Sequence, residues 1–306
     1  MAEYGGYYKI NGIPQTGEEL TTGNVYFVHS VSGSDGNSGR DPKHPFATLD
    51  YATGKCTANK HDVVYIMPNH AETISGATSW VPDVAGVQYI GIGVGSDAPQ
   101  LTFSAISSKI QATADNQTFK NIKFVGGISA IVAGLEITTG DYCTVEDCEF
   151  YYGGTSGYDF VIALRIDDAH YTTVKNCRFT AQNATDGASC AISIDASNFC
   201  TLENNIISGD YSAAAIHTPS SDAACTMLSV LGNQIYNDDT VSTGGGGIHF
   251  PVAHTGMIAH NNIGWLCKAA MADEAIDPGS CLMFENYICS AIDEYAMATL
   301  VGAASS

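Results

Sequence analysis

The chain has few basic residues, few prolines and no long apolar run. Lysine and arginine together number 12 against 32 acidic residues, which gives a formal net charge of −20. Because such a surface repels phosphate backbones, we expect no nucleic-acid partner, and the same repulsion disfavours an anionic polysaccharide. No window of about 18 apolar residues is present, so the sequence predicts no membrane span.

The sequence also lacks the usual signs of export, disulfide bonding and metal binding. Its first 20 residues have no basic start followed by an apolar stretch, so we expect folding in a cytoplasm. The ten cysteines form no CxxC motif, and Cys143 with Cys148 does not match a zinc-ligand spacing. We therefore predict small buried thiols, with no metal ion and no cofactor.

A six-residue pattern, apolar at its first and sixth positions, recurs between Phe119 and Ile288. Its copies begin at Phe119, Val145, Val174, Leu202, Val230, Ile258 and Met283. Each copy fits a short strand with one buried face, and the steps of 25 to 29 residues are typical of a solenoid.

The fourth position of this pattern carries a ladder of small polarizable or polar side chains. It holds Cys148, Cys177, Asn205, Asn233, Asn261 and Asn286. Stacked amides can hydrogen-bond from one coil to the next, as in cross-β stacks. We expect Cys148 and Cys177 to be stacked core thiols.

A parallel β-helix explains the pattern better than a leucine-rich repeat, because the L-x-x-L-x-L consensus is missing. A second strand set supports it, with strands ending at Ile166, Ile194, His217 and Phe250. The glycine-rich insertion between Asp238 and Gly247 fits a turn. The inward positions predict a core that contains Phe150, Ile166, Phe179, Ile194, Ile207 and Ile235.

The segment before the repeats reads VYFVHSVSGSDGNSGRDPKHPFATLDYA from Val25 to Ala52. Its Gly-Ser-Asp-Gly-Asn loop and P-x-x-PF-x-TL turn resemble the start of a pectate-lyase-like β-helix. The resemblance implies an all-β, single-domain, right-handed parallel β-helix over residues 25–290. Residues 1–24 would form an N-terminal arm or a cap over the first coil, and residues 291–306 a C-terminal tail.

The compact β-helix, its Tyr/Gly-rich leader and its small-residue tail are similar to β-helix proteins among phage structural components. That resemblance implies a homotrimer in the virion, made in the bacterial host cytoplasm, that contacts capsid or tail proteins. We expect a capsid decoration or short spike protein without catalytic activity, with a host-surface glycan as a further partner. The alternatives are a tailspike-like polysaccharide depolymerase, either hydrolase or lyase, and a glycan-binding adhesin.

The best candidate for chemistry is an outward stripe on the second strand set. Strand alternation turns these side chains away from the core: Arg165, Asp167, Ser193, Asp195, His217 and His249. Lyases of the resembled fold use an Arg or Lys base beside acidic Ca²⁺ ligands, and glycosidases use paired carboxylates. Arg165, Asp167, Asp195 and His217 are thus the catalytic candidates. The favoured interpretation is a solvent-facing polar stripe without catalysis.

Overall fold

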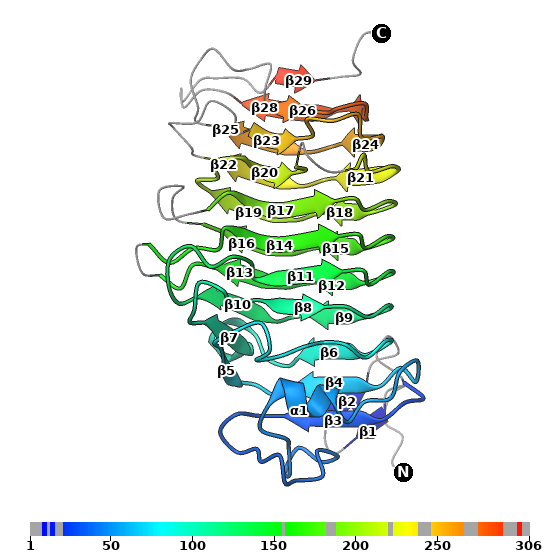
Figure 1. Cartoon of the computed structure of the whole chain (residues 1–306), viewed down its shortest axis with the longest axis vertical. Coiled ribbons are helices and arrows are strands. Elements are labelled where there is room, and N and C mark those ends of the chain that lie inside the picture. Colours follow the sequence, from blue (N-terminus) through cyan, green and yellow to red (C-terminus); the bar gives the residue numbers. More distant parts are fainter. Residues whose placement is uncertain are drawn as a thin grey trace.

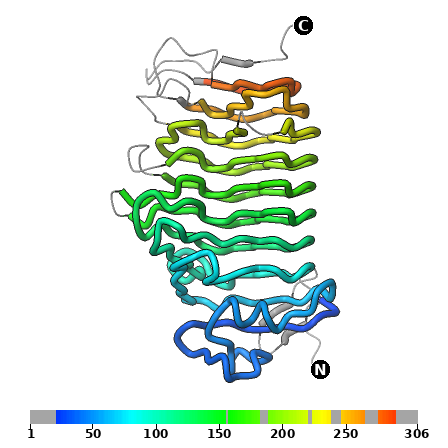
Figure 2. The backbone as a smooth tube through the Cα atoms, viewed as in Figure 1, coloured from blue at the N-terminus to red at the C-terminus, as the bar shows by residue number. Residues whose placement is uncertain are grey.

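The computed structural model describes residues 8–10, 13–15, 21–154, 157–181, 188–219, 223–237, 246–265, 275–289 and 299–301. Its strands stack coil upon coil along one long axis, with β3 near one end and β27 near the other (Figure 1). Figure 2 shows the same coils as a regular stack. Within the described ranges, all strand pairs except β1–β2 and β28–β29 are parallel. The chain is therefore a parallel β-solenoid, as the repeat predicts.

Three sheets run along the solenoid. Sheet I has ten strands, namely β3 (Val25–Val28), β4 (Val63–Ile66), β6 (Gln88–Gly91), β9 (Thr118–Lys120), β12 (Thr144–Glu146), β15 (Thr173–Lys175), β18 (Thr201–Glu203), β21 (Leu228–Leu231), β24 (Gly256–Ala259) and β27 (Leu282–Phe284). Sheet II has ten, namely β5 (Ala71–Ile74), β7 (Gln100–Phe103), β10 (Lys123–Gly126), β13 (Glu149–Tyr151), β16 (Arg178–Thr180), β19 (Ile206–Gly209), β22 (Gln234–Asn237), β25 (Asn262–Trp265), β28 (Asn286–Cys289) and β29 (Thr299–Val301). Sheet III has seven, namely β8 (Ile110–Ala112), β11 (Leu135–Thr138), β14 (Ile162–Asp167), β17 (Cys190–Asp195), β20 (Ala214–His217), β23 (Gly246–His249) and β26 (Ile276–Asp277).

The other described elements are short. They are the hairpin of β1 (Tyr8–Ile10) and β2 (Ile13–Gln15), the 3₁₀ helix η1 (Gly95–Asp97) and the helix α1 (Leu49–Thr53), which follows the P-x-x-PF-x-TL turn. No helix among the described residues has the length and apolar character needed to cross a membrane. Most of the insertion expected between Asp238 and Gly247 lies outside the described residues.

A single residue with positive φ turns the chain from sheet I into sheet II in seven coils. These residues are Asn121, Asp147, Asn176, Asn204, Gly232, His260 and Glu285, with φ between 46° and 64°. Most are Asn, Asp or Gly, which adopt left-handed backbone more readily than other residues. The bend takes one residue, so the next residue, at the ladder position, points into the core.

The ladder follows one hydrogen-bonding rule along its length. Each side chain donates to a sheet I carbonyl one coil back, as Cys177 Sγ does to Val145 O at 3.5 Å and Asn205 Nδ2 to Val174 O at 3.0 Å. The amides also bond to each other, Nδ2 to Oδ1 at 2.9 to 3.0 Å, through Asn205, Asn233, Asn261 and Asn286. The predicted amide ladder is confirmed.

The interior is packed by the residues that the pattern placed inward. The six predicted core residues, Phe150, Ile166, Phe179, Ile194, Ile207 and Ile235, are each at most 3% exposed. Phe124, Phe150 and Phe179 stack ring on ring, with centroids 4.6 and 4.8 Å apart. The register predicted from the sequence is therefore confirmed.

The cysteines behave as the sequence predicts. All eight cysteines whose side chains the structure describes are free thiols, and only Cys56 among them is not fully buried. Burial raises the pKa of Cys190 to about 12 and that of Cys143 to about 11. These thiols therefore remain protonated and chemically quiet near neutral pH.

Candidate functional site

The outward column of sheet III brings most of the predicted stripe together. Parallel pairing places Glu136 beside Arg165, Arg165 beside Ser193, and Ser193 beside His217 on successive strands. His249 follows His217 in the same column. Stripe residues from coils about 28 residues apart in the sequence thus lie about 4.8 Å apart in space.

The middle of this column is a chain of ion pairs. Lys109 Nζ lies 2.6 Å from Glu136 Oε2, and Glu136 Oε1 lies 3.7 Å from Arg165 Nη1. Arg165 Nε lies 2.9 Å from Asp195 Oδ2, and Ser193 Oγ donates to Asp195 Oδ1 at 2.9 Å. Glu136, which the sequence analysis missed, links the two basic groups. We call these five residues the ion-pair network.

The network is more buried than strand alternation suggests. Ser193 is 1% exposed, Asp195 3% and Glu136 4%. The prediction that Ser193 and Asp195 face solvent is therefore wrong, although both point away from the core. Because their carboxylates are removed from water, Glu136 and Asp195 depend on Arg165 and Lys109 for charge compensation.

Despite burial, the neighbouring carboxylates raise the pKa of Arg165. Burial alone would lower the pKa of Arg165, but the carboxylates of Asp195 and Glu136 outweigh burial and raise it. Arg165 is therefore held as a cation by the two carboxylates beside it.

His217 belongs to a separate part of the column. Its ring lies 5.4 Å from that of His249, and His249 Nε2 lies 3.5 Å from Asp277 Oδ2. Burial, with a smaller contribution from His249, lowers the pKa of His217 to about 4. His217 is thus neutral at pH 7, and the structure places it in a histidine pair outside the ion-pair network.

Asp167 lies opposite Asp195 in the pairing of β14 with β17. Among the residues that the structure describes, no three His, Cys, Asp or Glu side chains gather in a way that could hold a metal ion. The stripe therefore offers an arginine-clamped carboxylate and a neutral histidine pair, and no described set of Ca²⁺ ligands.

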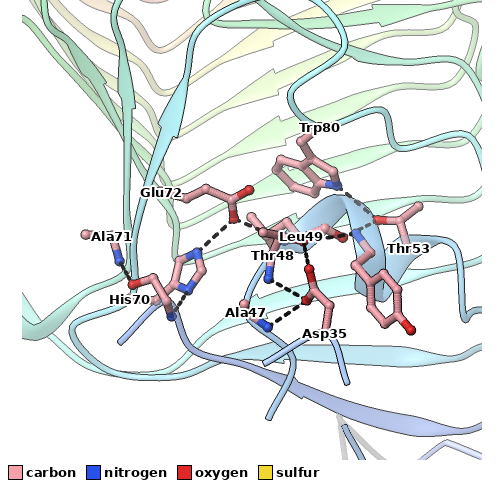
Figure 3. Close-up of polar contacts among 11 residues, drawn as sticks. Asp35, Ala47, Thr48, Leu49, Thr53, His70, Ala71, Glu72 and Trp80 are labelled. Carbon is pink, nitrogen blue, oxygen red and sulfur yellow. Dashed lines mark hydrogen bonds and ion pairs between the residues drawn. The ribbon is translucent and has the colours of Figure 1, made fainter. Parts of the chain in front are cut away.

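A second polar cluster lies where the chain enters the solenoid (Figure 3). Asp35 accepts hydrogen bonds from the backbone and hydroxyl of Thr48, the N-cap of α1, at 3.3 and 3.2 Å. Glu72 Oε2 accepts from Leu49 N at 3.0 Å and from His70 Nε2 at 3.1 Å. His70 Nδ1 accepts a backbone N–H, so the ring proton lies on Nε2. This cluster fastens α1 to β5, which is a structural role.

The turn between sheets III and I carries an exposed column that the sequence analysis did not identify. Tyr142, Tyr171 and Phe199 stack with centroids 4.6 and 4.7 Å apart, and Met227 follows in the next coil. They are 40 to 59% exposed and all have φ between 57° and 59°. We call these four residues the apolar ridge. Each precedes the first position of the repeat by three residues, a signal that the sequence does contain.

The outer face of sheet II carries a groove that was also missed. An open groove of about 750 Å³ crosses the strands from β16 to β28, and Arg178, Ile206, Gln234, Tyr236, Asn262 and Tyr287 line it. All of these except Tyr236 occupy the fifth position of the repeat. We call it the sheet II groove.

Comparison with known proteins supports the fold. No family model and no curated protein matches the chain. A pectin methylesterase in complex with a hexasaccharide has a TM-score of 0.50 at 12% identity, over 92% of this chain and 94% of that one. A polygalacturonate lyase fused with a self-assembling amphipathic peptide gives 0.50 at 12%, over 94% and 90%. A rhamnogalacturonan lyase gives 0.49 at 14%, over 79% and 69%.

The likenesses to the pectin methylesterase and the polygalacturonate lyase show that the chain has the right-handed parallel β-helix fold of pectate-lyase-like proteins, as the resemblance in its first coil implied. Their identities are too low to transfer an activity, because one fold hosts unrelated functions.

Proposed function

We propose that the protein is a non-catalytic structural β-helix of a phage particle, a homotrimer that decorates the capsid or forms a short spike. The observation that carries the proposal is the apolar ridge. A bulky side chain at a residue with positive φ strains the backbone and lowers the stability of the fold. A run of aromatic rings exposed to water is a further unfavourable contribution. Residues of this kind are expected where another surface covers them.

The charge of the surrounding face favours another copy of the same chain as that surface. A chain with a net charge of −20 repels its copies except where the contact is neutral. Next to the ridge, the outward column of sheet I alternates in charge through Lys120, Glu146, Lys175 and Glu203. Two positive and two negative side chains cancel there, so acidic copies can approach along this face.

The direction of the ridge suits parallel packing. One ridge residue comes from each successive coil, so the ridge runs along the long axis of the solenoid. Three solenoids packed side by side about a parallel threefold axis would bring their ridges together over several coils. Such packing would bury the ring edges of Tyr142, Tyr171 and Phe199.

The ion-pair network supports a structural role for the stripe. Arg165 compensates the buried carboxylates of Asp195 and Glu136 at 2.9 and 3.7 Å. Each of these groups is already engaged within the protein, so a substrate would have to break an ion pair to reach it. Removal of one partner would leave the others as uncompensated buried charges, which fits a structural role for the stripe.

The virion assignment is tested by mass spectrometry of particles purified from a culture that carries the gene. Cleavage after Arg165 and Lys175 gives a tryptic peptide of residues 166–175. We expect this peptide to co-purify with the particles through a density gradient. Recovery only from the soluble cell fraction would contradict the proposal.

A polysaccharide-processing enzyme is the second candidate. Asp167 and Asp195 are register partners, and a strand spacing of about 4.8 Å approaches the separation of about 5 Å in retaining glycosidases. The pectin methylesterase and polygalacturonate lyase of similar fold act on polysaccharides by their names. Release of reducing or unsaturated ends from surface polysaccharides, lost in Asp167→Asn, would establish this candidate in place of the first.

A further inference from the structure

We propose that the sheet II groove is a binding site for a neutral glycan chain, a function that goes beyond the structural role proposed above. The groove crosses five strands, so at a spacing of about 4.8 Å it is about 19 Å long. That length suits a short oligosaccharide lying along the solenoid axis.

A missing side chain shapes the floor of the groove. Tyr236 pairs with Gly264 on the next strand, and a Cβ at Gly264 would lie 3.2 Å from Tyr236 Cδ2. Gly264 thus leaves room for the Tyr236 ring beside the bare backbone. Tyr236 remains 44% exposed, and Tyr287 at the C-terminal end of the groove is 45% exposed. Exposed aromatic rings over a flat floor are suited to packing against the apolar faces of sugar rings.

The polar groups of the groove are available to a ligand. Gln234 and Asn262 are neighbours in one outward column, and each amide offers donors and an acceptor for sugar hydroxyls. Within the described part of the chain, neither side chain has a hydrogen bond to another residue. In the sheet III stripe, by contrast, the charged side chains of the ion-pair network pair with each other and are not available to a ligand.

Charge selects the class of glycan. Arg178 is the one cation among the residues that line the groove. The described residues contain no ion-pair partner for it. Glu149, its neighbour in the strand register, pairs with Lys123 at 3.3 Å instead. A guanidinium can donate several hydrogen bonds, including one to a sugar hydroxyl at one end of the ligand. With a chain charge of −20, a polyanionic glycan would be repelled, so a neutral chain fits best.

The test uses the full-length protein with neutral hexasaccharides (cellohexaose, maltohexaose, mannohexaose), with hexagalacturonate, and with an array of bacterial capsule and O-antigen polysaccharides. We expect calorimetry or the array to find a neutral glycan that binds. Tyr236→Ala should weaken binding about tenfold by removing the ring. Gly264→Val should also weaken glycan binding, because the valine side chain fills the floor of the groove. The variant removes no polar group, so its effect would come from the filled floor.

The matched control is Ile106→Asp, an exposed position outside the groove, which should bind like the unmodified protein. A glycan that binds equally well to Tyr236→Ala and Gly264→Val would overturn the proposal. Binding of hexagalacturonate alone, or of no probe at millimolar concentration, would overturn it as well. Because oligomeric mass and virion content are measured separately, failure here leaves the structural proposal unaffected.

Discussion

Asn205 donates a hydrogen bond from its side-chain amide to the side-chain oxygen of Asn233, one coil further along, at 3.0 Å. Both side chains are fully buried, and the same oxygen also accepts the backbone N–H of Asn205 at 3.0 Å. Adjacent coils are thus joined inside the core by side-chain bonds, in addition to their three sheets.

Removal of one rung should therefore destabilise the solenoid strongly. Asn233→Ala leaves buried amide and carbonyl groups of two neighbouring coils without a partner, so we expect a loss of about 3 kcal/mol or more in urea unfolding. Asn233→Cys should cost less, because Cys177 makes the equivalent bond to a carbonyl. The control Val31→Ala, at a position that is 83% exposed, should change stability little. Equal losses for Asn233→Ala and Val31→Ala would show that the ladder is incidental.

The apolar core gives a second stability prediction. Ile207 is 1% exposed and pairs with Phe179 and Ile235 in the neighbouring coils. Ile207→Ala leaves a cavity, and we expect a loss of about 2 to 5 kcal/mol by denaturant unfolding. Ile206→Ala, at the exposed neighbour, should cost under about 1 kcal/mol. The reverse order would mean that the register is wrong.

The ion-pair network should behave as a structural unit. Asp195→Asn leaves Arg165 with Glu136, at 3.7 Å, as its remaining ion-pair partner. We expect a loss of about 2 kcal/mol in the free energy of unfolding, less than for a fully buried pair because Arg165 is partly exposed. Addition of Arg165→Met to that variant should not increase the loss, since it removes the unpaired charge. An additive further loss in the double variant would show that the two side chains stabilise the fold independently.

His217 predicts a pH dependence of stability. Its pKa is lowered to about 4 in the folded chain from an ordinary value of 6.5, so the unfolded chain takes up the proton first. The stability due to neutral His217 is complete above about pH 6.5 and is lost as the pH falls toward 4. Melting temperatures of His217→Gln should therefore fall less than those of the unmodified protein between pH 7 and 4. Parallel curves would contradict this.

The solenoid was predictable because the same pattern of buried side chains recurs from coil to coil. A buried Phe150, Phe179 or Ile207 recurs at the same position in every coil, so periodicity alone reveals the inward face. The burial of Asp195 was not predictable from alternation, because its enclosure and its contact with Arg165 come from segments distant in sequence. Glu136 was missed for the same reason, since only the strand register places it beside Arg165.

The apolar ridge was missed for a different reason. Tyr142, Tyr171 and Phe199 lie in turns, outside the strand positions from which the buried face was predicted, although each keeps a fixed offset of three residues from the repeat. Their positive φ and mutual stacking exist only once the coils are stacked. Asn116, which has a φ of 58° one coil before Tyr142, shows that asparagine fits this turn.

Self-association through the ridge is tested most directly by light scattering on the unmodified protein and on Tyr171→Asn. Asparagine accepts the same backbone conformation, so the variant should fold while losing the exposed ring. We expect a mass of about 96 kDa for the unmodified protein, three times the 32.1 kDa of one chain, and a smaller mass for the variant. Ile106→Asp, exposed but outside the ridge, should leave the mass unchanged. A single-chain mass for the unmodified protein at micromolar concentration would show that the ridge does not hold copies of the chain together.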